Sequence, residues 1–146
     1  QFMEMYFGSR ICNCGIVEQI KEHPGWTTPR VSIKEHLNYK FIMSLEGNDV
    51  ATNLKWVMSS NSIAVMPRPT CETWFMEGRL IPDYHYIAIK DDLSDLEERL
   101  NYYIDHPDEA QKIINHAHEY VEQFRDEERE QIISLLVMEQ YLMLTR

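Results

Sequence analysis

The stretch from Tyr39 to Trp56 constrains the fold more than any other part of the chain. It starts with apolar, β-prone residues up to Leu45, and Glu46-Gly47-Asn48-Asp49 then reads as a tight turn. From Val50 to Met58 the apolar residues recur at helical spacing. The stretch therefore predicts a strand, a turn and a helix in succession, as in a parallel α/β sheet.

The glycine in this turn has two interpretations. The first turn of a helix carries backbone N–H groups without partners, and it is the positive end of the helix dipole. The free N–H groups and the positive dipole end both attract phosphate. Gly47 would let such a ligand approach the backbone closely. Alternatively, Gly47 only makes the turn and Asn48 or Asp49 caps the helix, because one glycine is a far weaker signal than a full Gly-x-Gly-x-x-Gly pattern.

Four short apolar segments are the predicted strands: Ile11 to Cys14, Phe41 to Leu45, Ile63 to Met66 and Tyr86 to Ile89. Segments this short and this apolar are best explained by burial on both faces of a sheet. Helical segments separate most of them, so we expect parallel strands joined by right-handed crossovers.

Shorter helical segments accompany these strands. Gln1 to Phe7 reads as the end of a helix that stops near Gly8. Ser32 is a candidate N-cap, and Glu35 three residues later completes a capping box. Thr73 to Met76 is also interpreted as helical.

The last third of the chain predicts three helices. The first apolar stripe ends at His106-Pro107, Pro107 suits the first turn of the second helix, and Asp126 can cap the third. The stripes consist, in order, of Leu93, Leu96, Leu100 and Ile104; of Ala110, Ile113, Ile114, Ala117, Val121 and Phe124; and of Ile132, Ile133, Leu135, Leu136 and Tyr141. We interpret all three as core contacts. The expected architecture is one Rossmann-like α/β domain over residues 1–146, with the sheet in residues 1–90 and the C-terminal helices in residues 91–146.

Charge and cysteine content narrow the class of protein. A formal charge of −10 argues against a nucleic-acid backbone as the main partner, because phosphate binding there needs a basic face. The three cysteines fit neither a disulfide framework nor a Cys-x-x-Cys pair, which indicates a reducing compartment. No apolar run reaches the roughly 20 residues that span a bilayer. The chain begins at Gln1 rather than Met, which suggests a fragment or a processed product.

The segment Arg68 to Trp74 follows a predicted strand, at the edge where open α/β sheets bind ligands. Glu72 can accept hydrogen bonds from ribose or sugar hydroxyls, and Trp74 offers a stacking face. A surface carboxylate beside a core tryptophan explains the same two residues equally well.

The sequence gives no sign of a metal site or of a serine nucleophile. The six histidines lack metal-ligand spacing, so we expect no metal, and no serine stands in a nucleophile elbow.

Four segments of the chain together resemble glycosyltransferase family 90: Tyr39-Lys40-Phe41-Ile42, Glu46-Gly47 through Lys55, Ser62-Ile63-Ala64-Val65 and Pro82-Asp83-Tyr84-His85-Tyr86-Ile87. This family holds bacterial lipopolysaccharide-modifying transferases, fungal capsule-associated proteins and animal protein O-glucosyltransferases. The amino-acid sequence from Glu46 to Trp56 is most similar to the sequences of the bacterial branch. The resemblance runs from about Gln1 to the end of the chain, and residues 39–89 carry its specificity.

The resemblance implies a GT-B-type enzyme with two Rossmann-like domains, and this chain is similar to the C-terminal, donor-binding one. The family's catalytic base belongs to the N-terminal half, so no catalytic residue is assigned and the chain alone is expected to be inactive. The donor diphosphate is implied to lie against the residues that follow Gly47, namely Asn48, Asp49, Val50, Ala51, Thr52 and Asn53, and Gly47 itself is assigned to the donor site as the turn that lets the ligand approach. Asn53 stands where animal members have an arginine, and Lys55 is the nearest cation that can replace it. We expect the helix that begins near Asn48 to Val50 to direct its free N–H groups at the diphosphate.

The implied reaction moves a sugar from a nucleotide-activated donor, a UDP-sugar, to a hydroxyl of a lipopolysaccharide or other surface saccharide. It needs a base at the acceptor hydroxyl and positive charge at the departing diphosphate, and this chain offers only the second. No other cofactor is implied. The intact protein is expected to be cytoplasmic, with peripheral association at the inner face of the membrane. The alternative is a non-catalytic interaction or scaffold α/β domain, which predicts no nucleotide binding and an exposed apolar patch on the C-terminal helices.

Overall fold

A three-stranded parallel sheet forms the centre of the computed structural model, which describes residues 2–145. The strands, in their order across the sheet, are β1 (Phe41–Met43), β2 (Ile63–Met66) and β3 (Ile87–Ala88). The register aligns Phe41 with Ile63 and Val65 with Ile87. The predicted parallel α/β fold and three of its four predicted strands are thus confirmed, although β1 and β3 are shorter than predicted.

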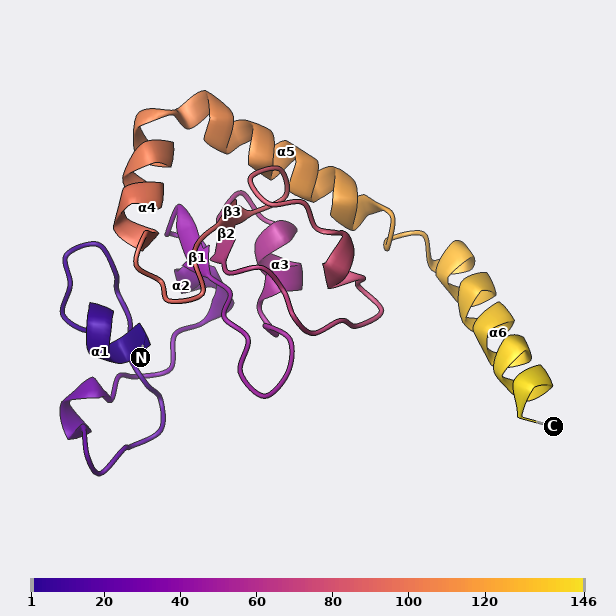
Figure 1. Ribbon diagram of the computed structural model, residues 1–146, viewed down its shortest axis with the longest axis horizontal. Coiled ribbons are helices and arrows are strands. Elements are labelled where there is room, and N and C mark those ends of the chain that lie inside the picture. Colours follow the sequence, from indigo (N-terminus) through magenta and orange to yellow (C-terminus); the bar gives the residue numbers. More distant parts are fainter. Residues whose placement is uncertain (1, 146) are drawn as a thin grey trace.

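Helices cover this sheet and extend beyond it, as Figure 1 shows. They are α1 (Phe2–Tyr6), α2 (Ile33–His36), α3 (Leu54–Met58), α4 (Leu96–Asp105), α5 (Pro107–Glu122) and α6 (Glu127–Leu144), with two 3-10 turns, η1 (Pro24–Trp26) and η2 (Glu77–Arg79). The three-helix C-terminal segment is confirmed, with Pro107 in the first turn of α5. The capping box at α2 is also confirmed, since Ser32 Oγ accepts from the Glu35 N–H at 3.3 Å and the Glu35 carboxylate accepts from the Ser32 N–H at 2.8 Å.

The first helix ends where the sequence predicts. Helix α1 stops at Tyr6, and Gly8 adopts a φ of +76°, a left-handed conformation that glycine tolerates and most residues avoid. Gln1, with which the predicted helix begins, lies outside the described residues.

The sheet has a buried core on each face. Ile42, Ala64 and Tyr86 pack with apolar residues of α3 and α5 on one face. Val65 and Ile87 point to the opposite face, where they pack with residues of α1 and α4. Both faces are therefore covered, which explains why these strands read as continuous apolar runs rather than alternating ones.

The predicted strand from Ile11 to Cys14 is wrong. These residues form no ladder with the sheet; the nearby Ile16 makes a single bridge with Thr27, where its N–H donates to the Trp26 carbonyl at 2.8 Å. The half-buried side chains of this segment pack against the core from a loop. An alternating pattern reports which side chains are covered, and a loop lying on a core produces it as well as a strand does.

Two predicted helical boundaries also differ from the structure. Residues 49–53 are not helical, so α3 begins at Leu54 instead of near Val50. The Val50 N–H donates to the Asp49 carboxylate at 2.8 Å, which favours a turn over a helix. Thr73 to Met76 is not helical, because Met76 takes a left-handed φ of 56° and ends any regular helix there.

The predicted core role of the third C-terminal helix is wrong as well. Helix α6 contains no buried residue, and Figure 1 shows it projecting from the body beyond the end of α5. Leu135, Leu136 and Tyr141 are more than half exposed. In α4, Ile104 is half exposed and Tyr103 is buried in its place, whereas the stripe of α5 packs on the core as predicted. Within residues 2–145, no helix combines the length and apolarity needed to cross a bilayer.

Candidate functional site

The carboxyl ends of β1 and β2 lead into the loops that hold all the predicted site residues except Lys55, which lies on α3. One carboxylate joins two of these loops: Glu46, after β1, accepts from the Thr70 N–H at 3.1 Å, the Thr70 hydroxyl at 2.6 Å and the Cys71 N–H at 3.1 Å. Burial raises the pKa of Glu46, but these hydrogen bonds outweigh it and the net pKa lies below its ordinary value. A charged Glu46 therefore fixes the loop after β1 against the loop after β2.

The turn after β1 presents some of its predicted residues to solvent and turns others inward. Gly47 is exposed, its φ is not positive, and a Cβ added to it would meet no atom within 4 Å. Asn48, Asp49 and Thr52 are also exposed. A second group, of Val50, Ala51 and Asn53, is partly or fully buried, and the Asn53 amide donates to the Met43 carbonyl at 2.8 Å. Asn53 thus ties the turn to β1 and does not face outward as a ligand-binding side chain would.

Lys55, the predicted replacement for the missing arginine, already has partners. Its ammonium lies 3.3 Å from the Thr73 hydroxyl, 3.6 Å from the Glu77 carboxylate and 5.5 Å from the centre of the Phe75 ring. Glu77 is only 2% exposed; burial raises its pKa, but hydrogen bonds from Thr73 and the charge of Lys55 lower it overall. Much of the Lys55 charge is therefore used to stabilise a buried carboxylate.

Glu72 and Trp74 both lie at the surface of the loop after β2. Glu72 is exposed, with its Oε1 3.2 Å from the position a Cβ would take on Gly78. The Trp74 side chain is 52% exposed, so it is not the core tryptophan of the alternative interpretation. Its indole N–H donates to the Glu130 carboxylate at 2.6 Å, which connects this loop to the first turn of α6.

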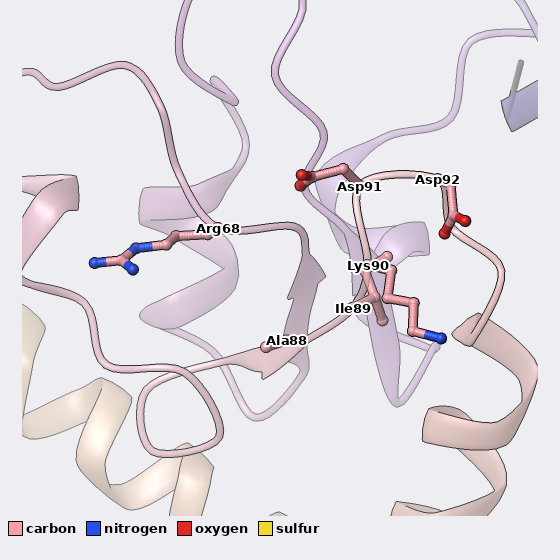
Figure 2. A pocket seen from close by; sticks show the side chains of 6 residues that line it. All are labelled: Arg68, Ala88, Ile89, Lys90, Asp91 and Asp92. Carbon is pink, nitrogen blue, oxygen red and sulfur yellow. The ribbon is translucent and has the colours of Figure 1, made fainter.

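A hollow of about 500 Å³ opens at the same edge of the sheet, between Arg68 and residues 88–92 (Figure 2). Its charged lining groups are Arg68, Lys90, Asp91 and Asp92. Arg68 was not among the residues predicted to bind a ligand. Its position two residues after a buried apolar strand was a usable signal, because charged side chains at that edge of a parallel sheet face the ligand site.

Two buried hydroxyl groups of the sheet lack hydrogen-bond partners among the described residues: those of Ser44, which directly follows β1, and Tyr86, which directly precedes β3. Burial raises the pKa of Tyr86, the nearby Arg68 guanidinium acts in the opposite direction, and Asp83 adds to the rise. No cluster of three or more His, Cys, Asp or Glu side chains within residues 2–145 is arranged to hold a metal ion. The expectation that no metal takes part stays a prediction.

Comparisons with known proteins point to sugar transfer. The model of glycosyl transferase family 90 matches residues 8–145. The O-glucosyltransferase LpsA of Dichelobacter nodosus is 42% identical over 144 residues, which are 99% of this chain and 45% of that protein. Protein O-glucosyltransferase 2 of Danio rerio is 31% identical over 83 residues, 57% of this chain and 16% of that protein. Uncharacterized protein 027R of Frog virus 3 is 30% identical over 115 residues, 75% of this chain and 12% of that protein. The chain therefore spans less than half the length of each of these relatives.

Proposed function

Because the chain belongs to glycosyl transferase family 90, we propose that it is the donor-binding part of a glycosyltransferase that moves a sugar to a hydroxyl group. Two relatives are O-glucosyltransferases by name, which supports glucose as the sugar and oxygen as the acceptor atom. The proposed donor is a UDP-sugar and the proposed acceptor is a saccharide of the lipopolysaccharide type. The proposed setting is a GT-B-type enzyme in the cytoplasm, at the inner face of the membrane, whose other half supplies the catalytic base.

One observation carries this proposal: the Glu46 carboxylate joins the loop after β1 to the loop after β2 at the carboxyl edge of the sheet. Gly47 and Glu72, which the sequence assigns to the donor, belong to these two loops and are both exposed. Ligands of open parallel sheets bind at this edge. The two loops therefore support a common role in holding one extended molecule, such as a nucleotide sugar.

In the proposed reaction, this part of the enzyme stabilises negative charge. Sugar transfer leaves negative charge on the departing diphosphate, and fixed N–H dipoles or cations near it lower the barrier. Helix α3 begins later than predicted and has a single short turn, so its N-terminus contributes little of this charge. The positively charged side chains near these loops are the better candidates.

Gly47→Val tests whether the turn after β1 contacts the donor. The space around Gly47 is open and its φ suits other residues, so we expect an unchanged melting temperature. A branched side chain would hold a diphosphate away from the backbone, and loss of such charged hydrogen bonds should weaken UDP-glucose binding by about tenfold or more. Isothermal titration of UDP-glucose measures the affinity. Gly25→Val is the matched control, because a Cβ at Gly25 also meets no atom within 4 Å.

Unchanged affinity in a folded Gly47→Val variant would remove this turn from the mechanism. No binding of any sugar nucleotide by the unsubstituted protein would count against the transferase proposal itself. The second candidate function, an interaction or scaffold domain, would then be preferred, since it predicts the exposed apolar residues that α6 carries.

A further inference from the structure

The positively charged side chains near the proposed donor site differ in what they already contact. Lys55 lies against Thr73 and the buried Glu77 carboxylate. Lys90 is adjacent to Asp91 and Asp92; hydrogen bonds with Ser94 and the charge of Lys90 lower the pKa of Asp92. Neither lysine therefore offers its full charge to a ligand.

Arg68 is placed differently. It is exposed, and no hydrogen bond or ion pair joins its side chain to another residue of the described chain. Pro67 and Pro69 flank it, and the two prolines restrict the backbone conformation just after the end of β2. In Figure 2 its guanidinium group points away from Lys90, Asp91 and Asp92, so the two carboxylates of the hollow do not neutralise it.

A second observation marks the same place. Tyr86 is fully buried, and its hydroxyl lacks a hydrogen-bond partner among residues 2–145. Arg68 is close enough to act on the titration of this hydroxyl. A buried hydroxyl without a partner costs free energy in the folded protein, and a role at a functional site is one explanation for such a group.

The geometry points to Arg68 as the side chain that binds the diphosphate of the donor nucleotide. The inference rests on the proposed function and adds a residue to its assignment, because Asn53 donates to the Met43 carbonyl and Lys55, although exposed, lies 3.6 Å from the Glu77 carboxylate. A guanidinium group matches two phosphate oxygens at once, whereas an ammonium group acts as a point charge. Arg68 also lies on the loop that Glu46 joins to the Gly47 turn, two residues before Thr70, whose N–H donates to Glu46.

Isothermal titration with UDP, uridine and inorganic pyrophosphate tests this assignment. Arg68→Ala should weaken UDP and pyrophosphate binding by about 10- to 100-fold, the usual range for a charged hydrogen-bonding pair, and leave uridine binding unchanged. Arg68→Lys should recover only part of the lost affinity, because it keeps the charge without the paired geometry. Lys112→Ala, which removes one exposed charge from α5, is the control and should bind UDP as the unsubstituted protein does.

The outcomes separate this inference from the proposed function. If the unsubstituted protein binds UDP and Arg68→Ala binds it equally well, the Arg68 assignment is wrong and the proposed function stands. An equal loss of UDP and uridine binding would also overturn the assignment, since it would show an effect on the nucleoside or on the fold. Circular dichroism and a cooperative melt establish that each variant is folded, and Arg68→Gln replaces Arg68→Ala if the latter fails this check. If the unsubstituted protein binds neither UDP nor pyrophosphate, the proposed function and this inference both fail.

Discussion

At the scale of single residues, hydrogen bonds and ion pairs stabilise the fold over both short and long separations in the chain. Ser32 and Glu35 lie three positions apart, so their mutual hydrogen bonds follow from helix geometry alone. Lys55 and Glu77 are 22 positions apart, and only the folded loop brings them together. The sequence could not show that Lys55 has this partner or that Arg68 has none among the described residues, because both are properties of the fold.

His85 provides a prediction at this scale. Its Nδ1 accepts from the Ile81 N–H at 2.9 Å, which requires a neutral ring. Burial and the neighbouring His116 lower its pKa, while Glu119 raises it; the net shift is downward. A histidine with a lowered pKa stabilises the fold fully above its ordinary pKa of about 6.5, and that contribution is lost as the pH falls through the lowered value.

The free energy of unfolding should therefore decrease between about pH 7 and pH 5, measured by urea denaturation. His85→Asn should reduce this pH dependence, because the amide oxygen can accept from the same N–H without titrating. His106→Asn is the control, since His106 is exposed and lies at the junction of α4 and α5. An identical pH dependence in His85→Asn and the unsubstituted protein would contradict the role given to His85.

At the scale of elements, apolar pattern predicts burial better than it predicts backbone geometry. Residues 41–43, 63–66 and 87–88 form strands because each segment has a neighbour in register across the sheet. Segment 11–14 has a similar pattern without such a neighbour, and its backbone stays irregular. The start of α3 was misplaced because Asp49 and Asn53 hydrogen-bond to nearby backbone groups and hold the preceding residues in a turn.

Helix α6 has a side-chain N-cap and contains no buried residue that would anchor it to the core. The Asp126 carboxylate accepts from the Arg129 N–H at 3.0 Å, and three glutamates in the first turn favour the helix dipole. Asp126→Ala should cost about 1 kcal/mol in the stability of α6. The loss should appear as faster amide exchange in residues 127–144, with little change in the sheet, because α6 contributes no buried residue to the core. Ser134→Ala, in the middle of the same helix, should not accelerate exchange; equal acceleration in both variants would show that the cap is not responsible.

At the scale of the whole molecule, the chain divides into a covered sheet and a projecting helix. The parallel sheet is buried on both faces by α1, α3, α4 and α5, and this arrangement followed from the order of apolar segments in the sequence. The apolar residues of α6 were also interpreted as core contacts from the sequence, but they lie outside this core. A sequence pattern shows that a face is apolar and cannot show which surface covers it.

A pair of substitutions in α6 tests this division. Leu135 and Leu142 are 62% and 49% exposed, whereas Leu96 in α4 is fully buried. Replacing both exposed leucines by glutamine should change the free energy of unfolding of the chain by less than about 0.5 kcal/mol, as for other surface positions. Leu96→Ala should cost about 2–5 kcal/mol, because it removes buried methyl groups and leaves a cavity beside β2 and β3. Urea denaturation of the unsubstituted protein and the two variants measures both effects.

A loss of stability in the double glutamine variant as large as that in Leu96→Ala would mean that α6 packs on the core after all. The expected difference would instead show that the apolar side chains of α6 are not needed for the stability of the sheet.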